Sequence, residues 1–194
     1  MRLEIIQNNY LHVQSFIKQD EVIKLSQEFK EHCTKFNLQG DPQALNSHSM
    51  YNFMPFVRLL VGKVPQVSEL LGEEVLPTYT YARVYKDNSE LLRHRDRPAC
   101  EISLTLNLLK DADWPIYFQR PDKFETSVEL EPGDAVMYLG CQADHWREKF
   151  KGQECIQLFL HYVRSYGPKS WAYFDKQQQQ SPTAPIDSIP KTFL

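Results

Sequence analysis

Residues 77–166 form a succession of short segments that are rich in β-branched and aromatic residues or alternate between apolar and polar ones. The segments are PTYTYARVY, CEISLTLNL, WPIYF, AVMYLG and CIQLFLHYV, and EPGD is one of the turn sequences between them. No stretch between these segments has helical periodicity. Many short strands without intervening helices are typical of antiparallel barrels of the jelly-roll or cupin kind. We therefore expect a mostly β protein with such a barrel as its core.

The residues before this region are expected to add helices to the barrel. Residues Tyr10 to Phe16 alternate as a strand does, and Asp20 follows as a candidate helix N-cap. Two amphipathic helices are predicted next, one ending near Phe36 and one from about Pro55 to Leu71, which Pro65 divides. The predicted buried stripe of the first helix is Val22, Leu25, Phe29, Cys33 and Phe36.

The length of 194 residues suits a single domain. Within it, we expect residues 1–76 to pack as a strand and helices on one face of the barrel, and residues 77–166 to form the barrel itself. Residues 167–194 contain four consecutive glutamines followed by SPTAPIDSIP. This composition predicts a flexible C-terminal tail.

Composition and charge limit the classes of partner and the cellular compartment that we expect for the protein. A net charge of -3 disfavours a nucleic-acid partner, which needs clustered positive charge, although Arg93, Arg95 and Arg97 form a local basic patch. No segment has the length of a membrane span, and the first residues lack the apolar stretch of a signal peptide. The 4 cysteines are widely spaced and are expected to be buried free thiols. We expect a cytoplasmic protein with no membrane partner.

The sequence LLRHRDRP places two metal-binding residue types two positions apart. In extended backbone, His94 and Asp96 point to the same side. A second histidine, His145, follows the strand-and-turn sequence EPGDAVMYLGCQAD. Two histidines and one carboxylate on one face leave coordination positions open, which is the ligand arrangement of non-haem ferrous oxygenases. Alone, the H-x-D pattern is a weak signal, because a histidine beside an aspartate is commonly a surface pair.

Four segments with their order and spacing give this pattern its context. They are YARVYKDNSELLRHRD, ACEISLTLNL, EPGDAVMYLG and HWREKFKGQECIQLFLHYV. Together they resemble the prolyl-4-hydroxylase-like branch of the 2-oxoglutarate and iron(II)-dependent oxygenase superfamily, over residues 79–163. The resemblance implies a double-stranded β-helix as the catalytic core. It also implies that His94, Asp96 and His145 are the iron ligands.

The resemblance further implies an activity, that of a 2-oxoglutarate- and Fe(II)-dependent dioxygenase. Such a hydroxylase uses O2 to hydroxylate a substrate C–H bond while 2-oxoglutarate becomes succinate and CO2, and ascorbate is the candidate reductant. The first expectation for the substrate is a prolyl side chain of a protein or peptide. The alternative is a free amino acid or another small metabolite. Nothing in the sequence predicts an oligomeric state.

The residues that would bind 2-oxoglutarate are also implied by position. Tyr85 and Thr105 stand where the family contacts the cosubstrate. The family's basic residue for the distal carboxylate commonly stands at the start of the final strand, where residues 154–157 here read ECIQ. We prefer Arg147 as its replacement, because it follows His145 by two positions and so points to the same side of a strand. The other candidates are Arg83, Lys149, Lys151 and Arg164, with Gln157 as a neutral hydrogen-bond donor.

Two further assignments and two competing functions remain open at this point. Arg95 and Arg97 flank Asp96 and are candidates for the substrate entrance, and His161 is expected to be a packed or hydrogen-bonded histidine. One competing function is a catalytically silent cupin-like binding module that kept the barrel. The other is a zinc hydrolase, in which the same three ligands would hold an activated water. The intact triad argues against a silent binding module. The aromatic and polar wall expected around the cosubstrate argues against a zinc hydrolase.

Overall fold

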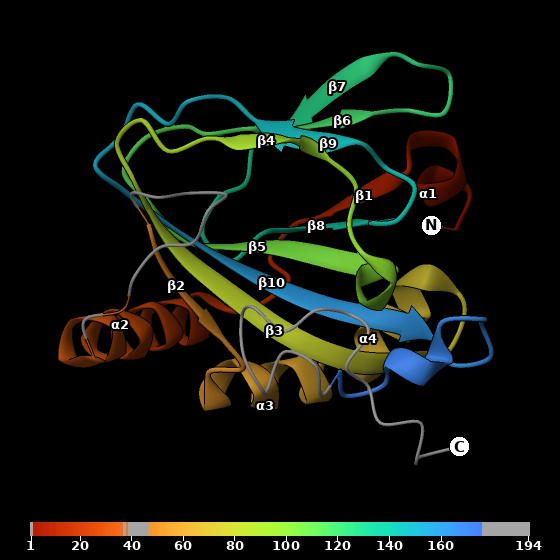
Figure 1. The fold of residues 1–194 in the computed structure, drawn as a ribbon, viewed down its shortest axis with the longest axis horizontal. Coiled ribbons are helices and arrows are strands. Elements are labelled where there is room, and N and C mark those ends of the chain that lie inside the picture. The colour runs from red at the N-terminus through yellow and green to blue at the C-terminus, as the bar shows by residue number, and fades with distance from the viewer. Residues whose placement is uncertain (1, 37, 39–46, 176–194) are drawn as a thin grey trace, which may run out of the picture.

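A computed structural model describes residues 2–36, 38 and 47–175 of the chain. Two antiparallel sheets face each other across the interior of a flattened barrel (Figure 1). The larger sheet has the strand order β1-β8-β5-β10-β3-β2, and the smaller sheet has the order β4-β9-β6-β7. The prediction of a mostly β protein with an antiparallel barrel and N-terminal helices is confirmed.

Long strands run through the middle of the larger sheet. Its strands are β1 (Tyr10–Val13), β2 (His48–Tyr51), β3 (Val75–Lys86), β5 (Ile102–Lys110), β8 (Ala135–Tyr138) and β10 (Glu154–Arg164). Strand β10 pairs with β3 on one side and with β5 on the other, so Gln157 is the register partner of both Arg83 and Asn107. Register partners share a face of the sheet. These three polar side chains therefore form one row across it.

The smaller sheet is built from short strands. They are β4 (Leu91–His94), β6 (Ile116–Gln119), β7 (Glu125–Val128) and β9 (His145–Arg147). Three of these, β4, β7 and β9, were not among the predicted strand segments. Each is too short for a period-two pattern to stand out. Strand β3 also begins at Val75, ahead of the predicted start at Pro77.

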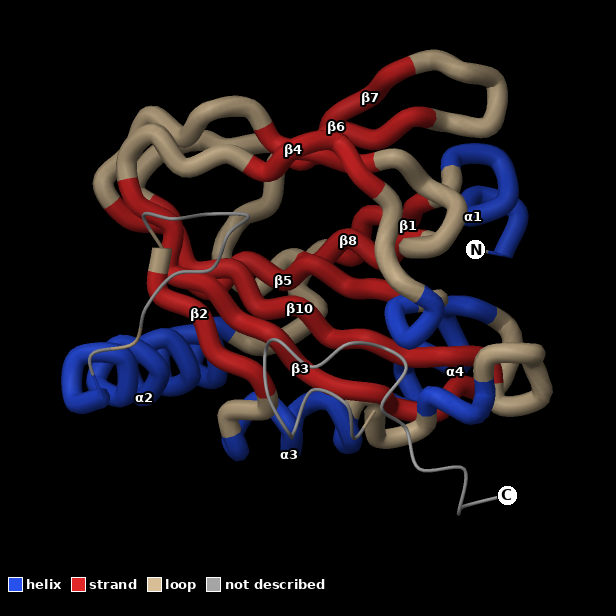
Figure 2. The backbone as a smooth tube through the Cα atoms, viewed as in Figure 1, coloured by secondary structure: helices blue, strands red, loops and turns tan. Residues whose placement is uncertain are grey.

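The helices are α1 (Arg2–Asn8), α2 (Gln19–Phe36), α3 (Met54–Gly62) and α4 (Val64–Leu71), and the 3-10 turns are η1 (Pro98–Cys100) and η2 (Ser170–Ala172). Helices α2, α3 and α4 cover the side of the larger sheet that points away from the smaller one, and α1 lies beside the β1 edge (Figure 2). Helix α2 contacts β5, and α3 and α4 contact β3. The part of the chain that the structure describes contains no helix of a length and apolarity that would cross a membrane.

The main apolar core lies between these helices and the larger sheet. Phe29 of α2 is fully buried, and its ring centroid lies 5.1 Å from that of Phe56 on α3. Full burial of one such side chain contributes about 1.5–3 kcal/mol relative to its exposed state. The predicted stripe of α2 is buried except for Phe36, which is 56% exposed at the end of the helix.

Three features of the helices differ from the prediction or refine it. Helix α2 begins at Gln19, so Asp20 lies in its first turn rather than at the N-cap. In the first turn its negative charge still interacts favourably with the positive end of the helix dipole. Helix α1 was not predicted, because it is too short to show a periodic pattern. The predicted division near Pro65 is confirmed, since α3 ends and α4 begins on either side of Lys63.

The predicted tail contacts the barrel over its first residues, 167–175. The backbone N–H groups of Phe174 and Asp175 donate to carbonyl oxygens on β3. In addition, the Asp175 carboxylate lies 2.5 Å from Nη2 of Arg97. Any tail must therefore begin later than predicted, and residues 176–194 lie outside the described residues.

Candidate active site

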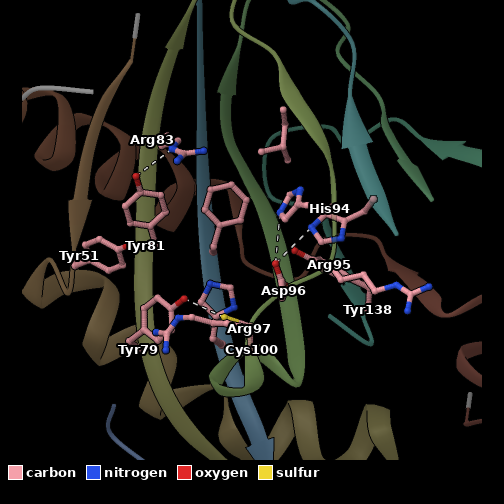
Figure 3. A pocket seen from close by; sticks show the side chains of 14 residues that line it. Tyr51, Tyr79, Tyr81, Arg83, His94, Arg95, Asp96, Arg97, Cys100 and Tyr138 are labelled. Carbon is pink, nitrogen blue, oxygen red and sulfur yellow. Dashed lines mark hydrogen bonds and ion pairs between the residues drawn. The ribbon is translucent and has the colours of Figure 1, made fainter. Parts of the chain in front are cut away.

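A cavity of about 310 Å³ opens between the two sheets (Figure 3). Its polar side carries His94, Asp96 and His145, and much of the opposite wall is aromatic and comes from the larger sheet. The cavity is lined by Tyr51, Tyr79, Tyr81, Arg83, Leu91, His94, Arg95, Asp96, Arg97, Cys100, Tyr138, His145, Phe159 and His161. The structure thus brings the three predicted metal ligands together in one cavity.

The pairing of β4 with β9 places the two histidines side by side. His94 ends β4, His145 begins β9, and the two are direct register partners. Asp96 lies two residues beyond the end of β4, and its backbone N–H donates to the carbonyl oxygen of Gly140 at 2.9 Å. Alternation in extended backbone puts His94 and Asp96 on the same side, as predicted from their spacing.

Hydrogen bonds to the backbone orient both imidazole rings. Nδ1 of His94 lies 2.7 Å from the carbonyl oxygen of Leu92, and Nδ1 of His145 lies 3.0 Å from that of Ala143. A carbonyl only accepts, so each Nδ1 carries the proton and each Nε2 keeps its lone pair. Both Nε2 atoms lie 3.6 Å from Oδ1 of Asp96. The backbone hydrogen bond on the remote nitrogen is the usual support of a metal-binding histidine.

The pKa shifts follow from burial and from the proximity of the three groups. Burial raises the pKa of the Asp96 carboxyl, but contact with His94, the charge of His145 and the Ser103 hydrogen bond outweigh it, and the pKa falls to about 2. Burial lowers the pKa of His145, and Asp96 offsets this only in part. For His94, burial also lowers the pKa, but Asp96 and the Leu92 carbonyl more than offset it. The carboxylate therefore supplies one negative charge beside two imidazoles.

Two residues that were not predicted hold Asp96 in place. The Ser103 hydroxyl donates to Oδ2 of Asp96 at 2.7 Å. The backbone of Gly140 lies so close that a Cβ atom there would stand 2.5 Å from the same oxygen. Ser103 had a sequence signal, because it belongs to the polar face of CEISLTLNL. The structure buries that face inside the barrel instead of exposing it to solvent.

Arg147 lies in the barrel interior beside the cavity, two positions after His145. Its side chain is buried, donates a hydrogen bond to the carbonyl oxygen of Trp114 and lies 4.8 Å from the Trp114 ring centroid. Its Nη2 has no hydrogen-bond partner, and no carboxylate in the described part of the chain forms an ion pair with it. Burial lowers the pKa of Arg147, yet a guanidinium remains charged in proteins. A buried cation of this kind is costly without an anion.

Arg83 is a second buried arginine, and it does line the cavity. Its Nε donates to the Tyr81 hydroxyl at 3.0 Å, and its Nη1 donates to the Tyr85 hydroxyl at 3.3 Å. The Tyr85 ring packs edge-on against Trp114, with centroids 4.7 Å apart. Trp114 and Tyr85 thus lie between the two guanidinium groups, and Tyr85, a predicted cosubstrate residue, contacts this pair without lining the cavity.

Further polar groups face the same interior. Thr105 on β5 is buried, and its hydroxyl oxygen has no hydrogen-bond partner in the described residues. The amide oxygens of Asn107 and Gln157 are buried and have no hydrogen-bond partner in the described residues. Buried polar atoms normally have partners, so this row of the larger sheet is prepared to contact a polar ligand.

The remaining basic candidates differ in their placement. Arg95 and Arg97 line the cavity, as the entrance prediction requires, and they form ion pairs with Asp144 and Asp175. Lys149, Lys151 and Arg164 do not line it. Both lysines are exposed, and Arg164 is engaged by Glu73 and Glu101.

The sequence did not identify the individual residues that form the aromatic wall of the cavity. Tyr51 of β2 lies with its ring centroid 4.4 Å from that of Tyr81, and the Tyr81 ring is stacked on Phe159 of β10. His161 packs on Tyr79 with centroids 4.5 Å apart, so it is a packed and hydrogen-bonded histidine as expected. Aromatic residues are common in barrel cores, so the sequence held no signal that these ones line a cavity.

The cysteines are all free in the structure. Cys33, Cys100 and Cys155 are buried, as expected, whereas Cys141 is only partly buried. Burial raises the pKa of the Cys100 thiol well above its usual value, and the neighbouring charge of Asp96 adds to this effect.

No family model and no curated protein sequence matches the chain. Solved structures do match. A prolyl-4-hydroxylase from Pseudomonas putida has a TM-score of 0.67 at 16% identity, with 83% of this chain and 95% of that chain covered. HygX from Streptomyces hygroscopicus, solved with nickel and 2-oxoglutarate bound, has a TM-score of 0.67 at 11% identity, with 85% and 87% covered. The epimerase SnoN of nogalamycin biosynthesis, solved with Fe3+ and alpha ketoglutarate, has a TM-score of 0.71 at 12% identity, with 97% and 91% covered.

These likenesses establish the fold. The chain has the double-stranded β-helix of the 2-oxoglutarate and iron(II)-dependent oxygenases, and structures of the prolyl-4-hydroxylase branch are among its matches. The fold that the sequence resemblance implied is therefore confirmed. At 11% to 16% identity the comparisons concern the fold, and the function has to be argued from the side chains.

Proposed function

We propose that this protein is a 2-oxoglutarate- and Fe(II)-dependent dioxygenase that hydroxylates a substrate C–H bond. The observation that carries the proposal is the convergence of two imidazole Nε2 atoms on one carboxylate oxygen, each at 3.6 Å, inside a cavity between the sheets. His94, Asp96 and His145 would hold the iron. Three ligands on one face leave positions for the cosubstrate and for O2. The nitrogen and oxygen donor set also fits ferrous iron.

For the cosubstrate we propose the buried interior beside the triad. Arg147 would pair with the distal carboxylate of 2-oxoglutarate through its unpartnered Nη2, because a planar guanidinium matches a carboxylate. Tyr85, Thr105 and Arg83 would supply further polar contacts around the same molecule. Arg147 does not line the cavity, so this assignment requires the cosubstrate to reach past the cavity into the interior. Arg83 lines the cavity and is the competing anchor.

The chain's own residues would mainly bind, orient and exclude water. When bound, Fe(II), 2-oxoglutarate and O2 supply the oxidising chemistry, and 2-oxoglutarate leaves as succinate and CO2. Ser103 would orient the Asp96 carboxylate, the Gly140 carbonyl would hold the Asp96 backbone, and two backbone carbonyls would orient the histidine rings. Such preorganisation is the usual contribution of the protein in cofactor enzymes. No side chain is required as a general acid or nucleophile.

For the substrate we propose a prolyl side chain of a protein or peptide. The aromatic wall of Tyr51, Tyr79, Tyr81 and Phe159 would pack against an apolar ring, and Arg95 and Arg97 would border the entrance. The alternative is a small molecule, because HygX and SnoN have been solved with hygromycin B and nogalamycin RO bound. We place the enzyme in the cytoplasm.

Iron-dependent formation of succinate tests the proposal against its competitors. The purified full chain, supplied with Fe(II), ascorbate and 2-oxoglutarate in air, should form succinate, whereas the Asp96→Ala variant should form none. Prolyl peptides and free amino acids are then compared for their stimulation of succinate release. A binding module or a zinc hydrolase would form no succinate under any of these conditions, and that result would refute the proposal.

A further inference from the structure

Asp96 faces a second group of metal-binding side chains on the side away from His94 and His145. Ligand atoms of Asp96, Cys100 and His161 all lie within 4.8 Å of one another. Cys100 ends the 3-10 turn η1 and His161 lies on β10, and both line the same cavity as the triad (Figure 3). We propose that these three residues form a second cation site, which takes a zinc ion.

The donor set suits zinc better than ferrous iron. A thiolate, an imidazole and a carboxylate are all common zinc ligands, and the thiolate is the soft one that favours zinc over iron. Cys100 and His161 are 3% and 5% exposed, so neither side chain is a solvated surface group. The Cys100 sulfur also lies 2.9 Å from the Tyr79 hydroxyl, which would hydrogen-bond a thiolate from the side. Binding would release the thiol proton to solvent.

A hydrogen-bond chain prepares His161 for this role. The Ser103 hydroxyl lies 2.7 Å from Oδ2 of Asp96 and 3.2 Å from the Cys100 carbonyl oxygen, and since both of these only accept, its single proton is used there. Nδ1 of His161 lies 2.9 Å from the same hydroxyl oxygen, so it must be the donor in that contact. Nε2 of His161 then keeps its lone pair. A metal ligand whose other ring nitrogen is fixed by a hydrogen bond is the usual arrangement.

Electrostatic repulsion should prevent the triad and the second cation site from binding metal ions at the same time. Both sites need Asp96, and two dications would bring four positive charges against only two negative ligands, Asp96 and the Cys100 thiolate. Arg83 and Arg97 line the same cavity and add to the repulsion. A single zinc ion on Asp96, Cys100 and His161 would have its charge fully neutralised. Zinc bound at this site would therefore take Asp96 away from the iron ligands. The expected inhibition of turnover by zinc rests on the proposed function.

Cobalt(II) is a suitable probe, because a thiolate bound to it absorbs strongly in the near ultraviolet. The metal-free full chain is titrated with cobalt(II) under anaerobic conditions and then with zinc. We expect one equivalent to produce the thiolate band and zinc to abolish it. In Cys100→Ser and His161→Gln the band should be lost or require at least tenfold more cobalt. Melting temperatures show that each variant is folded.

Matched variants separate this site from the triad. Cys141→Ser removes a nearby thiol that is outside the site, and His94→Ala removes a triad ligand, so both should keep the band. The band does not depend on turnover, so it is expected even in a protein that forms no succinate. Absence of the band in the wild type, its persistence in Cys100→Ser or its loss in Cys141→Ser would overturn the proposal.

Discussion

His94 and His145 are register partners across the antiparallel pair β4–β9, and their ring centroids lie 4.3 Å apart. Residues far apart in the sequence thus acquire a fixed relative position from backbone hydrogen bonds. Each ring is further held by a backbone carbonyl. A pair of imidazoles held by two strands of one sheet is a rigid base for a metal ligand set.

Removing any ligand of the triad should abolish turnover. His94→Ala, Asp96→Ala and His145→Ala each remove one of three donors, and the two that remain cannot hold iron in the same geometry. The fold should survive, since the main core lies on the other side of the larger sheet. Succinate formation and circular dichroism measure the two effects. His161→Ala provides the comparison and should be much milder, and near wild-type turnover in any triad variant would show that the triad is misassigned.

Arg147→Ala should weaken 2-oxoglutarate binding without loss of iron. Truncating one member of a buried charge pair costs about 2–5 kcal/mol. This corresponds to roughly 30-fold to several thousand-fold in affinity, at about 1.4 kcal/mol per decade. Titration calorimetry under anaerobic conditions measures the affinity. Arg147→Lys, which keeps the charge, should be affected less.

Two other arginines show which guanidinium is the anchor. Arg164→Ala is the control, because Arg164 is engaged by Glu73 and Glu101 outside the cavity. Arg83→Ala is a competing test, because Arg83 lines the cavity. An affinity within a few-fold of wild type in Arg147→Ala, together with collapse in Arg83→Ala, would transfer the role of anchor to Arg83.

Gly140→Ala should impair iron binding although residue 140 is not a ligand. The added Cβ would lie 2.5 Å from Oδ2 of Asp96 and would also collide with the Cys100 carbonyl oxygen. Overpacking of this kind costs about 1–3 kcal/mol. We expect at least a tenfold loss of iron affinity and a lower melting temperature. Gly62→Ala is the matched control, since a Cβ there has no neighbour within 4 Å, and equal effects in the two variants would contradict the steric explanation.

Glu101 should make stability depend on pH. Its carboxylate accepts hydrogen bonds from the backbone N–H and the guanidinium of Arg164, at 3.0 and 2.9 Å. Burial raises the pKa of Glu101, but these contacts outweigh it and the net shift is downward. A lowered pKa means that the stabilisation is fully present above the unfolded value of about 4.3 and is lost as the pH falls through the folded value. Glu101→Gln should therefore cost about 2 kcal/mol at pH 7.

Urea unfolding of both proteins at several pH values measures this effect. The difference in the free energy of unfolding between wild type and Glu101→Gln should shrink toward zero in acid. A difference that stays constant from pH 7 to below pH 3 would show that the charge of Glu101 is not its source.

The sequence predicted those parts of the molecule that depend on local pattern. The barrel class, the helix stripe around Phe29 and the pairing of His94 with Asp96 on one side all follow from period-two or helical spacing. The structure also places Arg147 inside the barrel, as its position after His145 suggested. Alternation along a short strand was enough for that inference.

Other parts of the site depend on long-range contacts that carry no local signal. The aromatic wall needs Tyr51 of β2 to lie beside Tyr81 of β3, and this pairing follows from sheet topology alone. The proximity of Cys100 and His161 to Asp96 likewise arises where η1 meets β10. The ion pair between Asp175 and Arg97 is also a long-range contact, so the sequence did not indicate that residues up to 175 lie against the barrel.

Binding of 2-oxoglutarate with and without Fe(II), under anaerobic conditions, tests the central claim most directly. If His94, Asp96 and His145 hold iron that the cosubstrate chelates, adding Fe(II) should raise the affinity of the wild type for 2-oxoglutarate by at least an order of magnitude. This corresponds to a coupling free energy between the two ligands of about 1.4 kcal/mol or more. Adding Fe(II) should leave the affinity of the Asp96→Ala variant for 2-oxoglutarate unchanged. Equal affinity of the wild type with and without Fe(II), or an undiminished effect of Fe(II) in Asp96→Ala, would contradict the account.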